Sequence, residues 1–340
     1  MNIFSFESSC DETSAAVVQD GRKILSNVVD TQIAMHTLYG GVVPEMASRR
    51  HAEVIVQVAD EALRQAGLSL SDIDAVAATC GPGLIGALLV GTNFAKGLSL
   101  ATGLPFIPIH HVRAHIAANY LAFPELKPPF LALSVSGGTS LLIAVKDYTD
   151  MEIIGGTRDD AAGEVFDKVA RVLGIGYPGG AVMDKLAQNG DRTKYVLPRA
   201  EVDDSPLDFS FSGLKSASIN LIHNAKQKGE EIDIPSFAAS FSQAVTDTLV
   251  PRTLCAAKTL GYNTVIAAGG VAANSMLRRE LTAKCEAEGI SVFYPPLSLC
   301  GDNGAMVGAQ AYYEYLAGNT GDLYQNSFAT VPINKDICKA

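Results

Sequence analysis

The sequence predicts an α/β protein made of two related halves. Two arrangements occur twice along the 340 residues, in the same order each time. The first is a strand, a polar turn and a return strand, and the second is a strand, a glycine turn and a helix. The composition agrees with a globular chain, because 48% of the residues are hydrophobic and 18% are charged. The duplication predicts two lobes that face a cleft, with the glycine-rich turns opening into it.

The first half is expected to run to about residue 125 and to begin with three strands. Strands are predicted at residues 3–6, 14–18, 23–29 and 73–80, and helices at residues 47–66 and 84–102. Asp20-Gly21 is a tight hairpin signal between two of these strands. Gly67 ends the first helix, and the turn Gly81-Pro82-Gly83 leads into the second.

The segment Ile107 to Ile116 carries a pair of histidines at helical spacing. A short extended run ends at Ile109 and leads into a predicted helix over residues 111–123. His111 and His115 are four residues apart, so they lie one turn above each other on the same helix face. Two such imidazoles can share a divalent metal ion if a third ligand comes from elsewhere in the chain. The alternative is that both are ordinary hydrogen-bonded histidines.

The second half repeats the plan of the first and is expected to end near residue 305. Its strands are predicted at residues 130–136, 140–145 and 264–268, and its repeated helix at residues 272–288. Inserted helices are predicted at residues 159–173, 181–188, 211–222 and 236–260. Pro251 should kink or split the last of these. The final helix, residues 305–317, is expected to pack back on the first half. The lobes would then comprise residues 1–125 with 306–340, and residues 126–305 with the helical insertions.

The composition argues against several classes of protein. No apolar run reaches transmembrane length without glycine, proline or charge, and the acidic residues Glu7, Asp11 and Glu12 stand where a signal peptide needs basic ones, so a cytoplasmic protein is expected. Six cysteines without a CxxC pair favour neither a disulfide framework nor a thiolate zinc site. The net charge of −10 argues against nucleic-acid binding over the whole surface. Local basic clusters stay open as binding sites or as solvated charge, at Arg49-Arg50, Lys168 with Arg171, Arg192 to Arg199, and Arg278-Arg279.

Glycine turns are candidate phosphate-binding sites, because backbone N–H groups in such turns and at helix starts bind phosphate oxygens. The candidates are Gly81-Pro82-Gly83, Ser136-Gly137-Gly138, and Gly269-Gly270 before Asn274. None has the Walker pattern or the GxGxxG spacing of a dinucleotide fold. Each is a plain turn when taken alone, but their recurrence in two repeated halves favours a nucleotide.

Several carboxylates are further candidates. Asp11 and Glu12 lie in the first polar turn, either as part of an Asx-type turn or as a base or metal–water partner that projects into the cleft. Asp167 and Asp184 lie near the glycine-rich loop at residues 174–180 and could hold ribose hydroxyls or be solvated. Asp302 precedes the last helix as its N-cap or as the third metal ligand. A site of two histidines and one carboxylate with open positions suits zinc or non-heme iron.

These residues lie in motifs that resemble the tRNA threonylcarbamoyladenosine transferase family of the bacterial TsaD type, also called YgjD or Gcp. The matching segments run in family order over nearly the whole chain, at residues 6–13, 40–45, 81–84, 110–115, 134–138, 160–168, 211–215, 269–274 and 300–303. The resemblance implies the duplicated actin, hexokinase and Hsp70 (ASKHA) fold with a nucleotide cleft. It implies that His111, His115 and Asp302 bind one divalent metal, Fe²⁺ by preference or Zn²⁺. It also implies that the substrate threonylcarbamoyl-AMP is held by Ser134, Val135, Ser136, Gly137, Gly138, Asp167, Gly180, Asp184 and Asn274.

The activity that the resemblance implies is an acyl transfer to tRNA. The threonylcarbamoyl group would pass from threonylcarbamoyl-AMP to N6 of the adenosine immediately 3′ of the anticodon, in tRNAs that read codons beginning with A, and AMP would be released. Asp11 and Glu12 would be the catalytic carboxylates, with Asp11 orienting or deprotonating the amine. The expected partners are tRNA, an inactive paralogue as heterodimer partner (TsaB type), a small ATPase (TsaE type) and an upstream threonylcarbamoyl-AMP synthase, with no membrane.

One departure from the family pattern and three rival functions need a test. The family usually reads Ser-Gly-Gly-His-Thr, whereas Thr139 and Ser140 follow Gly138 here, so a histidine beside the substrate is missing. The first rival is an HxxxH metalloprotease of the sialoglycoprotein endopeptidase type, although Val112 stands where HExxH has its general-base glutamate. The second is an ASKHA-fold small-molecule kinase, which would not need His111 and His115. The third is a non-catalytic scaffold paralogue, which would be expected to lack these residues.

Overall fold

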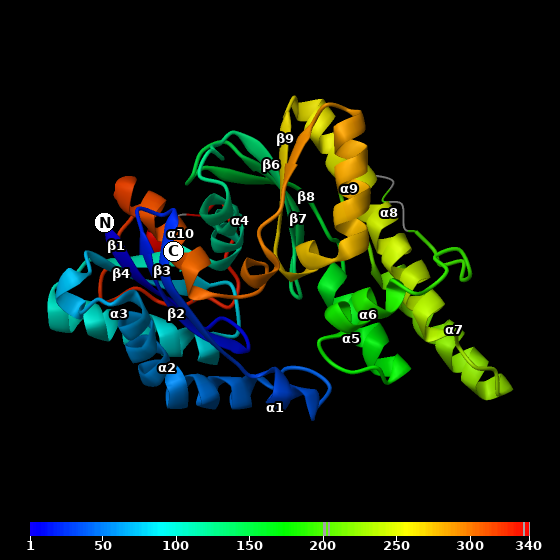
Figure 1. Cartoon of the computed structure of the whole chain (residues 1–340), viewed down its shortest axis with the longest axis horizontal. Helices are drawn as coiled ribbons and strands as arrows, with labels where there is room; N and C mark the ends of the chain where they lie inside the picture. Colours follow the sequence, from blue (N-terminus) through cyan, green and yellow to red (C-terminus); the bar gives the residue numbers. More distant parts are fainter. Residues whose placement is uncertain (200–201, 203–204, 336, 340) are drawn as a thin grey trace. The chain divides into compact units, whose positions relative to one another are not determined.

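The chain folds into two compact units, seen in a computed structural model that describes residues 1–199, 202, 205–335 and 337–339 (Figure 1). Unit 1 comprises Met1–Pro128, Val145–Glu152 and Pro295–Ala340, and unit 2 comprises Pro129–Ala144 and Ile153–Tyr294. Residues 336 and 340 of the expected first lobe lie outside the described residues. Among the described residues, no helix has both the length and the apolar character needed to span a membrane.

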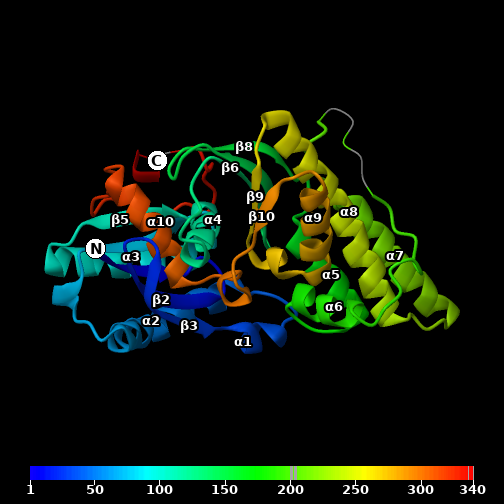
Figure 2. The ribbon, with the colours of Figure 1, turned by 45° about the horizontal axis from the view of Figure 1, so that its top comes forward.

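Unit 1 is a five-stranded mixed sheet with helices on both faces (Figure 2). The strand order is β3 (Lys23–Thr31), β2 (Glu12–Gln19), β1 (Asn2–Glu7), β4 (Ala75–Gly81) and β5 (Phe106–His110). The hairpin strands β1, β2 and β3 pair antiparallel, whereas β4 is parallel to β1 and β5 is parallel to β4. The helices are α1 (Ile33–Thr37), α2 (Pro44–Ala66), α3 (Ile85–Thr102), α4 (His111–Ala122) and α10 (Gly304–Leu316).

The alternation of side chains along β1 and β4 builds a separate core on each face of this sheet. Phe4 and Phe6 pack with the buried sides of α2 and α3. Ile3, on the opposite face, packs with α4 and α10. The final helix therefore returns to the first sheet, as the sequence predicted.

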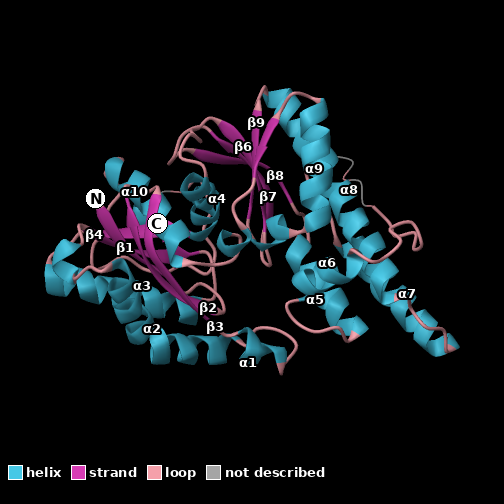
Figure 3. Cartoon of the chain, in the orientation of Figure 1, coloured by secondary structure: helices cyan, strands magenta, loops and turns pink. Residues whose placement is uncertain are grey.

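Unit 2 is built on a second five-stranded sheet (Figure 3). The strand order is β10 (Ser291–Phe293), β9 (Thr264–Ala268), β6 (Phe130–Val135), β7 (Ser140–Val145) and β8 (Met151–Gly156). The helices are α5 (Ala162–Leu173), α6 (Gly179–Ala187), α7 (Ser212–Lys228), α8 (Ile234–Leu260) and α9 (Ser275–Ala287). Leu131, Leu133 and Val135 of β6 share one hydrophobic core with buried residues of α5, α6, α8 and α9.

The two sheets have the same topology, which confirms the duplication. Counted from the hairpin edge, the orders are β3-β2-β1-β4-β5 and β8-β7-β6-β9-β10. In both sheets the first strand of the half pairs in parallel with its fourth, and the fourth with its fifth. Because side chains after the carboxyl ends of parallel strands meet at one sheet edge, each half carries polar turns at an equivalent position.

Several element boundaries differ from those predicted. Pro251 was predicted to kink or split its helix; the split is wrong, because α8 runs without interruption from Ile234 to Leu260, and the kink stays a prediction. A proline there leaves one carbonyl without its helical partner, and extensive burial of α8 in the unit 2 core outweighs that loss. The helix predicted from residue 272 begins at Ser275, because residues 270–273 form a 3₁₀ turn. Elements α1, β8 and β10 were not predicted.

The chain returns to unit 1 at Pro295, earlier than the expected return at residue 306. Buried Leu299 explains the difference, since it packs with Ile107 and Met306 in the core between α4, α10 and the first sheet. Asp302 therefore lies in the same unit as the histidine pair. The lobe boundaries expected from the duplication remain a prediction.

Candidate metal centre and nucleotide-binding turns

The histidine-bearing helix α4 starts where β5 ends. His110 is the last residue of β5, and its Nδ1 atom accepts a hydrogen bond from Val112 N (3.2 Å), which caps the helix. Arg113, which lies between His111 and His115 along the chain, is buried. Its Nε and Nη2 atoms donate hydrogen bonds to Ile333 O (3.0 and 2.7 Å). Its Nη1 atom also pairs with Glu314 of α10 (2.8 Å). These contacts fix α4 against the C-terminal segment and α10.

Asp302 is placed by the start of α10 but does not cap that helix. Asn303 is the N-cap, with its Oδ1 atom accepting from Met306 N at 3.0 Å, so the N-cap alternative for Asp302 is wrong. Gly304 N donates to Ser14 Oγ (2.7 Å), and a Cβ atom on Gly304 would lie 2.8 Å from Ala16 N. Glycine thus allows α10 to approach β2 closely. The carboxylate of Asp302 is therefore not used to cap α10.

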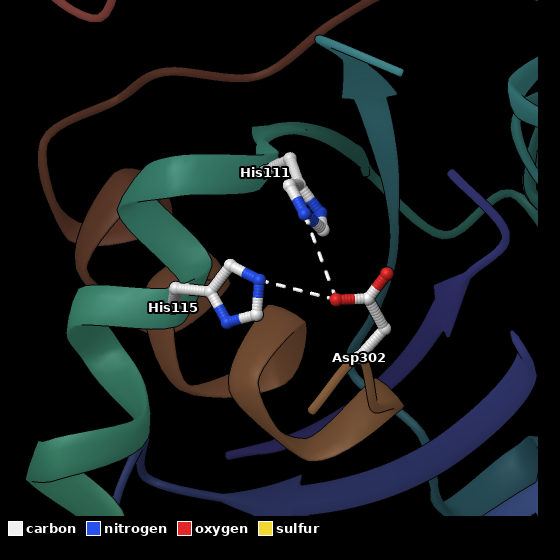
Figure 4. Close-up of side chains that lie close together, drawn as sticks. All are labelled: His111, His115 and Asp302. Carbon is white, nitrogen blue, oxygen red and sulfur yellow. Dashed lines mark ion pairs between the residues drawn. The ribbon is translucent and has the colours of Figure 1, made fainter. Parts of the chain in front are cut away.

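His111, His115 and Asp302 converge in unit 1 (Figure 4). Asp302 Oδ1 lies 3.7 Å from His111 Nε2 and 3.1 Å from His115 Nε2. Ligand atoms of a tetrahedral zinc site with bonds near ~2.0–2.1 Å lie about 3.4 Å apart. Among the described residues, neither ring nitrogen of buried His115 finds a hydrogen bond of normal geometry. An orphaned Nε2 atom that faces a carboxylate oxygen is what a metal ion would satisfy, so the residues fit a cation.

The electrostatics of this cluster favour a protonated His111 beside an ionised Asp302. Burial alone would lower the pKa of His111, but the carboxylates of Asp302 and Glu7 raise it to about 9. Burial alone would raise the pKa of Asp302, but His111 and His115 hold it below the usual value. The cluster therefore stabilises a positive charge beside Asp302, either a proton or a cation.

Buried Glu7 contacts His111 of the cluster, a role that was not predicted from the sequence. Its Oε2 atom lies 3.2 Å from His111 Nδ1 and accepts a hydrogen bond from Thr79 Oγ1 (2.6 Å). Its Oε1 atom accepts from Ser9 N (2.6 Å). Only the pairing of β1 with β4 brings Glu7 and Thr79 together, and that pairing cannot be read from spacing along the chain.

Asp11 and Glu12, the predicted catalytic residues, lie at the start of β2 in the same unit. Burial raises the pKa of Glu12, and the neighbouring carboxylates of Asp302 and Asp11 raise it further. Buried His51 of α2 supports this turn through Cys10 O (2.9 Å) and Thr13 Oγ1 (2.7 Å). One residue of α2 thus contacts the chain on both sides of the two carboxylates, at a backbone carbonyl and at a hydroxyl.

The predicted substrate residues all belong to unit 2. In the turn after β6, Ser136 N donates to Thr139 O (2.8 Å), and the hydroxyls of Ser136 and Thr139 lie 2.9 Å apart. Gly163 N at the start of α5 donates to Ser136 O (3.1 Å). Ser134 and Val135 are fully buried, so their side chains are not exposed for a ligand. The turn at Ser136–Thr139 is the accessible part of this motif.

The remaining polar substrate candidates are engaged at helix starts. Asp167 accepts from Gly179 N at the start of α6 (2.7 Å). Asp184 accepts from Ser275 N (2.9 Å) and Ser275 Oγ (2.8 Å) at the start of α9. Asn274 caps α9 by accepting from Leu277 N (2.9 Å). Gly180 follows Gly179 in α6. The predicted residues thus gather at the beginnings of α6 and α9, where backbone N–H groups are directed outward.

The predicted glycine turns are divided between the units. The turns at Ser136–Gly138 and Gly269-Gly270 lie in unit 2, and Gly81-Pro82-Gly83 lies in unit 1. Gly269 has φ +89° and approaches Val135 O so closely that any side chain would clash, which joins the ends of β9 and β6. This contact requires glycine for a structural reason.

A family model and two relatives that match the chain share one description. The family model described as tRNA N6-adenosine threonylcarbamoyltransferase matches residues 23–309. The tRNA N6-adenosine threonylcarbamoyltransferase of Moorella thermoacetica is 53% identical over 333 residues, which are 98% of this chain and 97% of that protein. The protein of the same name from Clostridium botulinum strain 657 is 50% identical over 335 residues, or 98% of each chain.

Solved structures share the fold at low sequence identity. HypF of T. kodakarensis matches 93% of this chain and 48% of that protein, with a TM-score of 0.62 and 15% identity. Component A of (R)-2-hydroxyglutaryl-CoA dehydratase from Acidaminococcus fermentans matches 93% of this chain and 98% of that protein, with a TM-score of 0.54 and 17% identity. Together with the repeated sheet order, these likenesses confirm the predicted duplicated α/β fold of the actin, hexokinase and Hsp70 class.

Proposed function

The chain belongs to the tRNA N6-adenosine threonylcarbamoyltransferase family, and we propose on that premise that it transfers a threonylcarbamoyl group from threonylcarbamoyl-AMP to adenosine in tRNA. The acceptor would be N6 of the adenosine immediately 3′ of the anticodon in tRNAs that read codons beginning with A. In this reaction the amine nitrogen bonds to the carbamoyl carbon, the bond from that carbon to the phosphate oxygen breaks, and AMP leaves. The proton lost from the amine needs a base.

His111, His115 and Asp302 would hold one divalent ion, Fe²⁺ by preference and Zn²⁺ as the alternative. The observation that carries this proposal is the convergence of Asp302 Oδ1 with two histidine Nε2 atoms at 3.1 and 3.7 Å. A set of two histidines and one carboxylate leaves coordination positions open. When bound, the ion would supply Lewis-acid polarisation of a carbonyl or phosphate oxygen.

Asp11 and Glu12 would divide the acid–base work. Because its pKa is raised by burial and by neighbouring carboxylates, Glu12 would remain protonated at neutral pH. A protonated Glu12 can donate a hydrogen bond to Asp11. Asp11 would then orient the acceptor amine and take its proton.

The substrate nucleotide would bind unit 2. The backbone N–H groups of the turn at Ser136–Thr139 and at the starts of α6 and α9 would bind its phosphate, since such groups bind anions well. Asp167 and Asp184 would exchange their present N–H partners for ribose hydroxyls or orient those helix starts. Thr139, which stands in place of the family histidine, already bonds to Ser136 and would keep that turn closed.

Because the net charge is −10, binding of tRNA would need a helper protein or a local basic patch. Several of their cations are paired with acids, including Arg49 with Glu45, Lys168 with Asp160 and Arg192 with Glu280. We therefore expect partner proteins: an inactive paralogue as heterodimer partner, a small ATPase, and an upstream synthase that supplies threonylcarbamoyl-AMP. Because its substrate would be tRNA, we expect the protein to act in the cytoplasm.

The decisive assay combines labelled threonine, bicarbonate and ATP with the upstream synthase, the partner proteins and unmodified tRNA. Label should enter tRNA with the wild-type chain, and the variants H111A, H115A and D302A should lose both bound metal and transfer. The matched control is H223A, since His223 is an exposed histidine of α7 far along the chain from the cluster. Full transfer by a metal-free H111A/H115A double variant would refute the proposal.

A further inference from the structure

We propose that Glu7 is a positioning residue that holds the proton of His111 on Nδ1 and thereby presents Nε2 to the metal. The inference rests on the proposed metal site, and it adds a residue that lies outside the predicted metal, catalytic and substrate-binding sets. A metal-bound histidine needs one nitrogen with a free electron pair, and the partner of the other nitrogen decides which one that is.

The first argument is the set of contacts around Glu7. The residue is 1% exposed. Its carboxylate receives a backbone N–H from Ser9 at 2.6 Å, a hydroxyl from Thr79 at 2.6 Å, and faces His111 Nδ1 at 3.2 Å. Two of these neighbours are donors, and a buried carboxylate is stabilised by donors and by positive charge. A bare Nδ1 electron pair facing Oε2 would be repulsive, so the contact selects the Nδ1–H form of His111.

The second argument is the far side of the same ring. In the metal-bound state, with its remaining proton on Nδ1, His111 would direct an unprotonated Nε2 toward the side on which Asp302 Oδ1 lies, 3.7 Å away. His115 Nε2 lies 3.1 Å from the same oxygen. Two histidine nitrogens and one carboxylate oxygen, each a potential metal ligand, thus lie within 4.8 Å of one another, an arrangement that suits a bound cation. Ser9 Oγ also lies 3.2 Å from His111 Nδ1, and it can accept the same proton without changing this assignment.

The third argument is that Glu7 is itself held by the sheet. It is the last residue of β1, and the register that pairs Phe6 with Ala78 of β4 sets it beside Thr79. The arrangement connects two central strands to the first residue of α4. A carboxylate, a histidine and a metal in this order form a recurrent support for metal sites.

Glutamine cannot replace Glu7 without loss. If its carbonyl oxygen faces Thr79 and His111, its amide N–H₂ group meets the N–H of Ser9, which is also a donor. If the amide is flipped, N–H₂ faces His111 Nδ1 and selects the opposite form of the ring, with the proton on Nε2. Either orientation leaves a mismatch at a buried site, and the second directly blocks metal binding.

The test measures Zn²⁺ binding and the protonation of the histidine rings in the full chain labelled with ¹⁵N-histidine. Zn²⁺ is chosen because it is diamagnetic and leaves the NMR spectra readable. In the wild type, long-range ¹H–¹⁵N spectra should show His111 protonated at Nδ1 and metal-bound at Nε2. Competition with a chromophoric chelator should show that Glu7→Gln weakens Zn²⁺ binding by about 10–100-fold. The matched control is Glu314→Gln, another buried carboxylate that contacts α4 through Arg113 but no metal ligand. It should bind Zn²⁺ within about threefold of the wild type.

The outcomes separate this inference from the metal proposal. A wild-type chain that binds no Zn²⁺ and no Fe²⁺ overturns both. A wild-type chain that binds metal through Nδ1 of His111 overturns only the role of Glu7. This NMR measurement uses the wild-type chain, so it does not depend on whether a variant folds. Equal weakening by Glu7→Gln and Glu314→Gln also overturns it, since that result indicates a general structural effect. Glu7→Asp keeps the charge but shortens its reach, so it should weaken binding less than Glu7→Gln.

Discussion

At the scale of single residues, protons and metal compete for His111. The pKa of His111 in the metal-free chain is raised to about 9 by Asp302 and Glu7 against the opposing effect of burial. A metal must displace the Nε2 proton, so Zn²⁺ affinity should fall about tenfold for each pH unit below this value. Chelator competition between pH 6.5 and 9.5 at fixed ionic strength measures how the Zn²⁺ affinity depends on pH. An affinity that is independent of pH would contradict the assignment.

The same group gives the opposite trend for stability of the metal-free chain. A folded-state pKa above the unfolded value stabilises the fold fully below the unfolded pKa, which is about 6.5 for histidine, and that contribution is lost as the pH rises through about 9. The melting temperature of the chelator-treated protein should therefore fall as the pH rises through this window. H111A serves as the control, since it should lack this component of the pH dependence.

Variants of two adjacent residues at the start of α10, Asp302 and Asn303, should separate metal binding from helix capping. D302N should lose metal binding, because a neutral amide replaces the anionic ligand. N303A should keep the metal but lower the free energy of unfolding by about 0.5–2 kcal/mol, because it removes the cap on Met306 N. Metal titration and denaturant unfolding of both variants provide the measurements. Metal loss in N303A with unchanged stability would reverse the roles given to the two residues.

The sequence could identify the metal-ligand candidates but not their support. His111 and His115 were predictable because helical spacing puts them on one face, and Asp302 because it adjoins a helix start. Neighbouring Asp302 and Asn303 are both good N-cap residues, so only the backbone conformation separates cap from ligand. Glu7 was not predictable as a partner of His111, since their contact depends on strand register and on the entry of α4.

At the scale of elements, glycine contacts determine how the turn after β6 meets α5. A Cβ atom on Gly163 would lie 2.5 Å from Ser136 O and 2.8 Å from Gly137 Cα. G163A should therefore displace the turn, destabilise the protein by about 1–3 kcal/mol and weaken AMP binding. Calorimetry with AMP and denaturant unfolding test both effects.

The control for G163A is G213A in the first turn of α7. Gly213 is exposed, and no atom lies within 4 Å of a Cβ atom built there, so alanine should be neutral or slightly stabilising. Equal AMP affinity in G163A and the wild type would contradict the proposed phosphate site.

The boundaries of an element were predictable where a residue at its end, such as a glycine after a helix, determines them. Gly67 and Gly103 end α2 and α3 in the left-handed conformation, as expected for glycine after a helix. Pro251 was misleading because its local cost is small beside the burial of α8. The short strand β10 carries little periodicity over Ser291–Phe293 and forms by pairing with β9, which no local pattern reveals.

At the scale of the whole molecule, the duplication assigns different ligands to different units. The predicted metal ligands belong to unit 1, and the predicted substrate residues belong to unit 2. The repeated sheet order was predictable because both halves repeat the same sequence of strands, turns and helices. The two halves nevertheless differ in their candidate functional residues. Helix α4, which follows β5, carries the histidine pair, and no equivalent pair follows the described strand β10.

Hydrogen exchange can test this division of ligands directly. Zn²⁺ alone should slow exchange in segments around its ligands, residues 106–122 and 295–310, because a bound ligand stabilises the structure that it bridges. AMP alone should slow exchange around residues 134–140, 162–185 and 270–280, where the turn and the starts of α6 and α9 lie. The D302N chain is the control, since it should keep the response to AMP and lose the response to Zn²⁺. Protection of the unit 2 segments by Zn²⁺ alone, equal to that by AMP, would contradict separate binding sites.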